Sequence, residues 1–301
     1  MNKPVVPTSL TFVPRRPPAM AGEQTAAAGS LMQGKRGLIM GVANDHSIAW
    51  GIAMMLAKHG AELAFTYQGD ALAKRVKPLA ESVNSKLVMP CDVEDIASVD
   101  AVFETVRKQW GTMDFLVHAV AFSDKNELKG RFADTTRENF TRTMVISCYA
   151  FTEAARRAAA LMPNGGSMLT LTYNGGDRAM PNYNVMGVAK AGLEASVRYL
   201  AVDFGHQKIR VNAISAGPIR TLAGAGITDA RYMFAFQQKY SPLGRGVTLD
   251  ELGGAGLYLL SDLSTGVTGE IHFVDSGYNV ISMPQPDALK AAGGQVENGS
   301  G

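Results

Sequence analysis

Short apolar runs alternate with segments of helical periodicity along most of the chain, and this alternation constrains the fold more than any other feature. Continuous apolar strands separated by helices are typical of a parallel sheet that is covered by helices on both faces. Because crossovers between parallel strands are right-handed, we expect one doubly wound α/β sheet of about seven strands. The predicted strands are 36–41, 61–67, 86–89, 113–119, 167–173, 209–214 and 271–274. The predicted helices between them are 47–59, 71–82, 96–110, 137–161 and 182–204.

No break in composition divides the region that carries this pattern, so residues 34–284 are predicted to form a single domain. Residues 1–33 contain many prolines and alanines but no apolar periodicity, which predicts a disordered or loosely ordered extension. Residues 285–301 are rich in glycine and alanine and are predicted to be a flexible tail.

The composition excludes several classes of protein. Hydrophobic residues make up 46% of the chain and charged residues 19%, which excludes intrinsic disorder and allows a large core. The net charge of +2 argues against a nucleic-acid partner, and no apolar run is long enough to span a membrane. The two cysteines, Cys91 and Cys148, cannot build a disulfide framework or a four-cysteine metal site. We therefore expect a protein of the reducing cytoplasm that holds no metal.

Ligands of doubly wound sheets bind beyond the carboxyl ends of the strands, so the residues after each strand are candidates for a site. The run from Gly41 to Gly51 follows the first predicted strand and could form the phosphate-binding turn of a Rossmann-like nucleotide site. Gly41 would supply the tight turn, Ser47 would cap the helix and donate its hydroxyl to a phosphate, and Gly51 would let the helix pack closely on the strand. The run is not G-x-G-x-x-G, and an ordinary strand–turn–helix with a serine cap explains it equally well.

Three further strand ends carry candidate contacts for a dinucleotide. Gln68 is neutral and can bond to a ribose hydroxyl, which favours NADH over NADPH. Asp92 could accept a hydrogen bond from an adenine amine while Val93 packs on the ring, although Asp92 could instead cap the next helix. The run 118–123 supplies small residues beside which a nicotinamide ribose could lie.

Tyr173, Tyr183 and Lys190 form the sharpest cluster of candidate chemistry. Tyr173 ends a predicted strand, whereas Tyr183 and Lys190 fall at the start of the next predicted helix. A separation of seven residues turns a helix through about 700°, so both side chains share one face, about 10 Å apart along the axis. A phenol whose pKa is lowered by a nearby cation can serve as an acid and as an oxyanion partner. An amphipathic helix with a surface lysine and a half-buried tyrosine would also explain the pair.

Two longer runs, with several shorter ones, carry a resemblance to a known family. The longer runs extend from Pro181 to Ala191 and from Arg210 to Thr221. The shorter runs are Gly41 with Ser47-Ile48-Ala49, Thr66-Tyr67-Gln68, Cys91-Asp92-Val93 and Asp275-Ser276-Gly277. Over residues 34–282 the chain resembles the bacterial enoyl-acyl-carrier-protein reductases, a divergent branch of the short-chain dehydrogenase/reductase superfamily. Ordinary members of that superfamily space the pair as Tyr-x3-Lys, whereas Met186 stands at that tyrosine position here.

The resemblance implies an activity and assigns roles to residues. It implies an NADH-dependent homotetramer that reduces the trans-2 double bond of enoyl thioesters on acyl carrier protein, the last reductive step of a fatty-acid elongation cycle. The implied catalytic residues are Tyr173, Tyr183 and Lys190. The implied NAD contacts are Gly41, Ser47, Ile48, Gln68, Asp92, Val93, Val120, Lys190, Ile219, Arg220, Thr221, Leu222 and Ala223. The run His118-Ala119-Val120-Ala121-Phe122 departs from the family's His-Ser-Ile-Gly-Phe, which puts the side chains beneath the nicotinamide in doubt.

The substrate is expected to lie beside Ser123 and the two tyrosines. The segment 221–240 holds several large apolar residues among small ones, which fits either a core helix or a cover that opens over an acyl chain. The resemblance favours a small helical substrate lid, with Met233 and Phe234 against the substrate.

Two other functions remain open on the residues alone. One is a carbonyl or hydroxyl dehydrogenase of the same superfamily, against which the missing Tyr-x3-Lys argues. The other is a nucleotide-sensing regulator without turnover, which would not need an acid partner such as Tyr183 beside Lys190.

Overall fold

A seven-stranded parallel sheet with the order β3-β2-β1-β4-β5-β6-β7 forms the centre of the computed structural model, which describes residues 29–219 and 230–283. The order turns back between β1 and β4, which lie side by side, so the predicted doubly wound sheet is confirmed. The strands are β1 (Arg36–Met40), β2 (Glu62–Tyr67), β3 (Leu87–Pro90), β4 (Phe115–His118), β5 (Gly166–Thr172), β6 (Ile209–Ala216) and β7 (Ile271–Val274).

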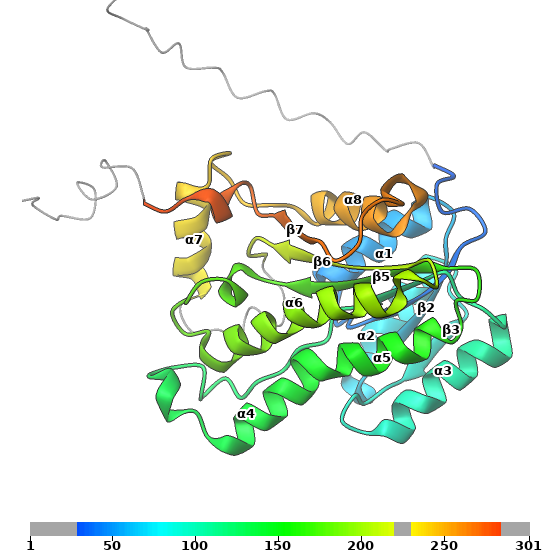
Figure 1. Cartoon of the computed structure of the whole chain (residues 1–301), viewed down its shortest axis with the longest axis horizontal. Helices are drawn as coiled ribbons and strands as arrows, with labels where there is room; N and C mark the ends of the chain where they lie inside the picture. The colour runs from blue at the N-terminus through cyan, green and yellow to red at the C-terminus, as the bar shows by residue number, and fades with distance from the viewer. Residues whose placement is uncertain (1–28, 220–229, 284–301) are drawn as a thin grey trace, which may run out of the picture.

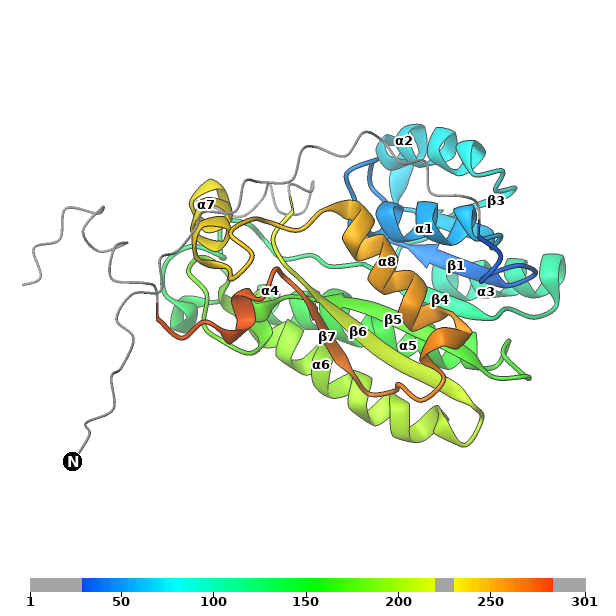
Figure 2. The same cartoon turned by 90° about the horizontal axis from the view of Figure 1, so that it is seen from above.

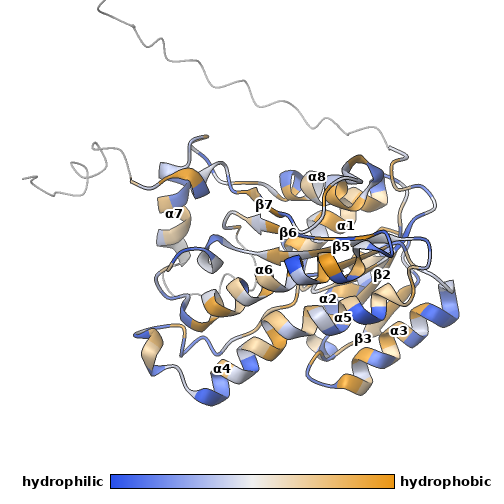
Figure 3. Ribbon diagram, in the orientation of Figure 1, coloured by the Kyte–Doolittle hydropathy of each residue, from blue (hydrophilic) through white to orange (hydrophobic). Residues whose placement is uncertain are grey.

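Helices cover both faces of this sheet (Figure 1). The helices are α1 (Ile48–Lys58), α2 (Gly69–Ser82), α3 (Ile96–Trp110), α4 (Arg137–Met144), α5 (Ala150–Ala159), α6 (Asn184–Gly205), α7 (Ala230–Tyr240) and α8 (Leu249–Leu260). One core cluster joins α3, α5 and α6 to the sheet, and a second joins α1, α2 and α8 to the opposite face. Successive residues of β1 alternate between them, because Leu38 belongs to the first cluster and Ile39 to the second. Figure 3 shows the apolar strands between helices whose outer turns are polar.

The predicted helix 137–161 is divided in the structure. One π-helical turn, Val145–Tyr149, separates α4 from α5. Such turns occur inside otherwise continuous α-helices, so the sequence pattern of this segment predicts a single helix. Within the residues that the structure describes, no helix is long and apolar enough to cross a membrane.

Helix α8 is absent from the predicted elements because its glycines weaken the helical pattern. Those glycines let α8 lie directly against α1. A Cβ at Gly253 would stand 2.7 Å from the carbonyl oxygen of Gly51, and a Cβ at Gly51 would stand 2.9 Å from that of Leu249. Gly51 was predicted to let α1 pack closely on a strand. This prediction is wrong, because the element that approaches Gly51 closely is α8.

The folded part begins before Gly34, which corrects the predicted boundary. Met32 is fully buried, and its backbone N–H donates to the carbonyl oxygen of His59 at 2.9 Å. A Cβ at Gly29 would collide with the His59 ring, so this segment lies against the end of α1. The rest of the predicted extension, residues 1–28, and the predicted tail lie outside the described residues.

Replacing Met32 with alanine should lower the free energy of unfolding by about 2–5 kcal/mol, because truncating a buried methionine leaves a cavity. Chemical denaturation of the whole chain measures the loss. Leu31→Ala is the matched control, since Leu31 is 42% exposed and its truncation should cost little. Equal losses for the two variants would contradict the placement of Met32 in the core.

Candidate active site

A cavity of about 340 Å³ opens beyond the carboxyl ends of β1, β4, β5 and β6. Most of its wall is apolar, and Met233 and Phe234 of α7 form part of it. Figure 2 shows α7 at the end of the sheet where α6 begins. The predicted site residues that line the cavity are Ile48, Ser123, Tyr173, Tyr183, Lys190, Ile219, Met233 and Phe234.

The side chains of the two tyrosines contact each other at the N-terminal end of α6. Tyr173 directly follows β5, and Tyr183 directly precedes α6. Their rings pack edge to face with centroids 5.2 Å apart. Asn182 and Asn184 flank Tyr183 with φ of 57° and 33°, a backbone conformation that asparagine tolerates better than most residues. A Cβ at Gly175 would collide with the Tyr183 ring, so the glycine leaves the space that this ring fills.

Burial sets the protonation state of both phenols. It raises the pKa of Tyr183, and the charges that act on Tyr183 raise it further. Burial also raises the pKa of Tyr173, and a hydrogen bond from Gln237 opposes that rise. The condition on which the sequence made this phenol a candidate acid, a pKa lowered by a nearby cation, is therefore not met, because desolvation dominates at a buried phenol. Both hydroxyls stay protonated near neutral pH and can donate hydrogen bonds.

Lys190 brings a buried cation to the cavity. Its side chain is 7% exposed, and its Nζ donates to the carbonyl oxygen of Leu171 at 2.8 Å. Burial lowers its pKa to about 8, against opposing effects of Cys148 and Glu194. Glu194 lies one turn further along α6 and accepts a hydrogen bond from the Thr172 hydroxyl at 2.6 Å. The ammonium thus donates one hydrogen bond to a backbone carbonyl oxygen, and its other N–H groups are available to a ligand in the cavity.

His118, at the end of β4, is a further titratable group near Lys190. Its ring packs against Phe151 with centroids 5.5 Å apart. Burial, together with the charge of Lys190, lowers its pKa to about 3. His118 is therefore neutral at physiological pH and does not compete with the tyrosines as an acid.

The loop after β1 approaches the loop after β4 very closely. Gly41 has a φ of 100°, and a Cβ there would collide with the backbone of Ala119. The predicted cap by Ser47 is wrong. Its hydroxyl oxygen accepts the backbone N–H groups of Ala43 at 3.0 Å and Asn44 at 3.1 Å, because the loop folds back before α1 begins. The first turn of α1 is left without a side-chain cap.

The remaining predicted cofactor residues lie at neighbouring strand ends, beside the cavity rather than in its wall. Gln68 is exposed after β2, and Val120 is partly buried after β4. Asp92 follows β3 and accepts the backbone N–H of Glu94 at 3.0 Å, while Asp95 caps α3. The alternative interpretation of Asp92 as the cap of that helix is therefore wrong. Val93 packs on the core next to it.

The strand order makes these positions one continuous row. Because β3, β2, β1 and β4 are neighbours in the sheet, the residues after them follow each other along one edge. Of the predicted contacts after β6, Ile219 lines the cavity, whereas residues 220–223 lie outside the described residues.

Sequence reasoning missed one polar contact in the site. Gln237 on α7 donates from Nε2 to the Tyr173 hydroxyl oxygen at 2.7 Å. A signal for it exists, because Gln237 follows Met233 by four residues and so lies on the buried face of α7. Leu128 and Met186 also line the cavity and were not predicted as contacts.

Comparisons with known proteins agree on one family. The family model described as "Enoyl-(Acyl carrier protein) reductase" matches residues 41–279. Enoyl-[acyl-carrier-protein] reductase [NADH] 2 of Rhizobium meliloti is 72% identical over 262 residues, which cover 87% of this chain and 98% of that protein. The enoyl-[acyl-carrier-protein] reductase [NADH] of Rickettsia typhi is 56% identical over 251 residues, which cover 83% of this chain and 96% of that protein.

A solved structure agrees as well. The crystal structure of the Anaplasma phagocytophilum enoyl-(acyl-carrier-protein) reductase in complex with NAD has a TM-score of 0.83 and 59% identity, and covers 85% of this chain and 98% of that chain. The chain therefore belongs to the enoyl-(acyl-carrier-protein) reductase family, within the short-chain dehydrogenase/reductase superfamily.

Proposed function

We propose that this protein reduces the trans-2 double bond of enoyl thioesters carried on acyl carrier protein, with NADH as the reductant. This is the last reductive step of a fatty-acid elongation cycle. The observation that carries the proposal is the convergence of two protonated phenols and a buried ammonium on one apolar cavity. The Rhizobium meliloti and Rickettsia typhi relatives, which are named as NADH-dependent enoyl-[acyl-carrier-protein] reductases, support it.

The residues of the site fit a nicotinamide dinucleotide. The close approach at Gly41, the uncapped first turn of α1 and the row of strand ends suit an extended ligand with a pyrophosphate at its centre. Lys190 offers a cation at the end of the row that meets the cavity. The residues proposed to hold the cofactor are Gly41, Ser47, Ile48, Gln68, Asp92, Val93, Val120, Lys190 and the segment that begins at Ile219.

When bound, NADH supplies a hydride to the β-carbon of the enoyl thioester. Electrons of the double bond then shift toward the thioester oxygen, where negative charge develops. The Tyr183 hydroxyl donates a hydrogen bond to that oxygen, and a donor already in place stabilises the charge without reorganisation. The enolate would then take a proton from solvent water at its α-carbon, which would yield the saturated thioester.

The other residues bind and orient. Lys190 holds the cofactor and adds positive potential where the charge develops. Ser123 is proposed to lie beside the substrate. The apolar side chains of Leu128, Met233 and Phe234 enclose the acyl chain and exclude water.

Gln68→Arg is expected to shift cofactor preference toward NADPH. Gln68 is exposed at the end of β2 and offers no cation for a 2′-phosphate, so the natural chain should prefer NADH. An arginine there would pair with the phosphate and raise kcat/KM with NADPH. The ratio of kcat/KM for the two cofactors measures the shift. If the natural chain had a kcat/KM with NADPH equal to or higher than that with NADH, the proposed role of Gln68 would be contradicted. An enoyl-acyl carrier protein reductase of Bacillus cereus has been crystallised with NADP⁺. Its structure has a TM-score of 0.83 and 48% sequence identity to this chain, and the match covers 84% of this chain and 100% of that chain.

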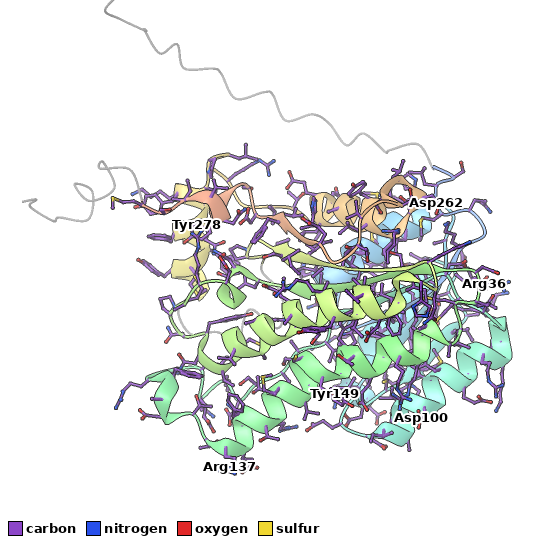
Figure 4. The ribbon with its side chains drawn as sticks, in the orientation of Figure 1. Arg36, Asp100, Arg137, Tyr149, Asp262 and Tyr278 are labelled. Atoms are coloured by element: carbon purple, nitrogen blue, oxygen red, sulfur yellow. The ribbon has the colours of Figure 1, made fainter. Side chains whose placement is uncertain are left out.

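The assembly that we propose is a homotetramer. Large apolar side chains are exposed on the outer helical layer, among them Tyr149 at 54%, Tyr199 at 75% and Val202 at 79%. Figure 4 shows Tyr149 on the outer side of that layer. Large exposed apolar side chains of this kind are candidates for a protein interface. Light scattering on the whole chain should give four times the mass of 32.0 kDa.

We further propose a cytoplasmic location. Cys91 and Cys148 are the chain's two cysteines, and both are free and buried. Burial raises the pKa of Cys91 to about 11, so its thiol is inert. Free thiols without a disulfide suit a reducing compartment.

The experiment that tests the function is the oxidation of NADH with trans-2-octenoyl coenzyme A, with a ketone and with no substrate. The proposal expects turnover with the enoyl thioester alone. Turnover with the ketone would instead favour a carbonyl reductase of the same superfamily.

A further inference from the structure

Among the residues that the structure describes, one polar side chain of helix α7 joins it to the end of the sheet. Gln237 donates from Nε2 to the Tyr173 hydroxyl oxygen at 2.7 Å. Tyr173 directly follows β5, and both it and Met233, one turn earlier on α7, line the cavity. The hydrogen bond therefore links the helix that covers the cavity to a phenol that forms its wall.

The packing of α7 does not explain why residue 237 is a glutamine. Gln237 is 4% exposed, and within the described part of the chain its Oε1 has no hydrogen-bond partner. An unpaired buried amide oxygen is destabilising, so an apolar side chain of the same size would suit the packing better. Helix α7 also makes an aromatic contact outside the helix, since the Phe236 ring meets that of Tyr278 at a centroid distance of 6.4 Å. Figure 4 shows Tyr278 beside α7.

The direction of the hydrogen bond determines where the proton of Tyr173 can go. The phenol oxygen accepts from Gln237, so the phenol's own O–H is not used by α7. Because Tyr173 lines the cavity, an acceptor oxygen inside the cavity can receive that proton as a hydrogen bond. A thioester substrate brings such an oxygen.

We propose that Gln237 is a positioning residue, which holds the Tyr173 hydroxyl so that it donates to an acceptor oxygen of the thioester substrate when α7 covers the cavity. The inference rests on the proposed function and adds a specificity element to it. Gln237 acts through Tyr173 on substrate binding, and Tyr183 remains the donor to the developing charge.

A double-mutant cycle tests this coupling. It compares the natural chain, Gln237→Met, Tyr173→Phe and the double variant, with NADH and trans-2-octenoyl coenzyme A. Gln237→Met keeps the length of the side chain and removes the amide. We expect KM for the thioester to rise about 3- to 10-fold, with kcat within about twofold. In the Tyr173→Phe background the same change should have no further effect.

Two readouts separate positioning from a structural role. Gln237→Met should keep or raise the melting temperature, because it removes an unpaired buried amide, and it should leave NADH affinity unchanged. Gln238→Met makes the same chemical change at the next, exposed residue of α7 and should alter neither KM nor the melting temperature. Gln237→Leu repeats the test with a stiffer side chain.

The coupling decides the outcome. An unchanged KM in Gln237→Met, or an equal rise in KM in the Tyr173→Phe background, would overturn the inference while the natural chain still turns over. No turnover by the natural chain would overturn the proposed function, and the inference with it.

Discussion

Lys190→Met is expected to weaken NADH binding by roughly 10- to 100-fold, because a buried charged hydrogen bond contributes about 1.5–3 kcal/mol. Methionine keeps the length and the apolar stem of the side chain and removes only the ammonium. Fluorescence titration of NADH measures the change. Lys86→Met is the matched control, since Lys86 is exposed just before β3, at the opposite end of the strands from the cavity.

The pH dependence of NADH binding tests the same residue independently. Burial lowers the pKa of Lys190 to about 8, so the side chain is cationic below that pH and neutral above it. NADH affinity should therefore be highest below pH 8 and fall as the pH rises through 8. The Lys190→Met variant should lose this dependence. If the affinity of the natural chain is flat across this range and Lys190→Met binds NADH normally, Lys190 does not hold the cofactor.

Tyr183→Phe is expected to lower kcat about 100-fold, the usual loss when one donor to a developing oxyanion is removed. The ring and its edge-to-face contact with Tyr173 remain. NADH affinity should hardly change, because the hydrogen bond strengthens only in the transition state. Steady-state kinetics with trans-2-octenoyl coenzyme A measure the effect.

Tyr173→Phe provides the comparison for this prediction. It removes a hydroxyl from the same cavity, but one that we propose to act on substrate binding rather than on the developing charge. Its kcat should therefore fall much less than that of Tyr183→Phe. The reverse ranking, in variants that fold and bind NADH, would exchange the roles of the two tyrosines.

The elements of the fold were predictable wherever periodicity was strong. The predicted strand 271–274 and helix 96–110 coincide with β7 and α3, because an apolar run and a stable helical pattern mark them. Helix α8 was not predictable in this way. Its glycines weaken its helical pattern, and their purpose, the contact with α1, exists only in three dimensions.

The site shows the same division. Helical spacing and the resemblance placed Tyr183 and Lys190 at one cavity, and the structure has both in its wall. The partner of Ser47 was not predictable, because it depends on the path of the loop before α1. The direction in which the pKa of Tyr183 shifts was not predictable, since sequence spacing reveals a nearby cation but not the degree of burial.

The destination of the hydride tests the account most directly. The natural chain would be given trans-2-octenoyl coenzyme A and NADH that carries deuterium in place of the transferred hydrogen at C4 of the nicotinamide ring. The product would be analysed by mass spectrometry and NMR. We predict a saturated thioester that carries deuterium at the β-carbon. Deuterium at a newly formed alcohol carbon, or an unreacted double bond, would contradict the assignment of this site to enoyl thioester reduction.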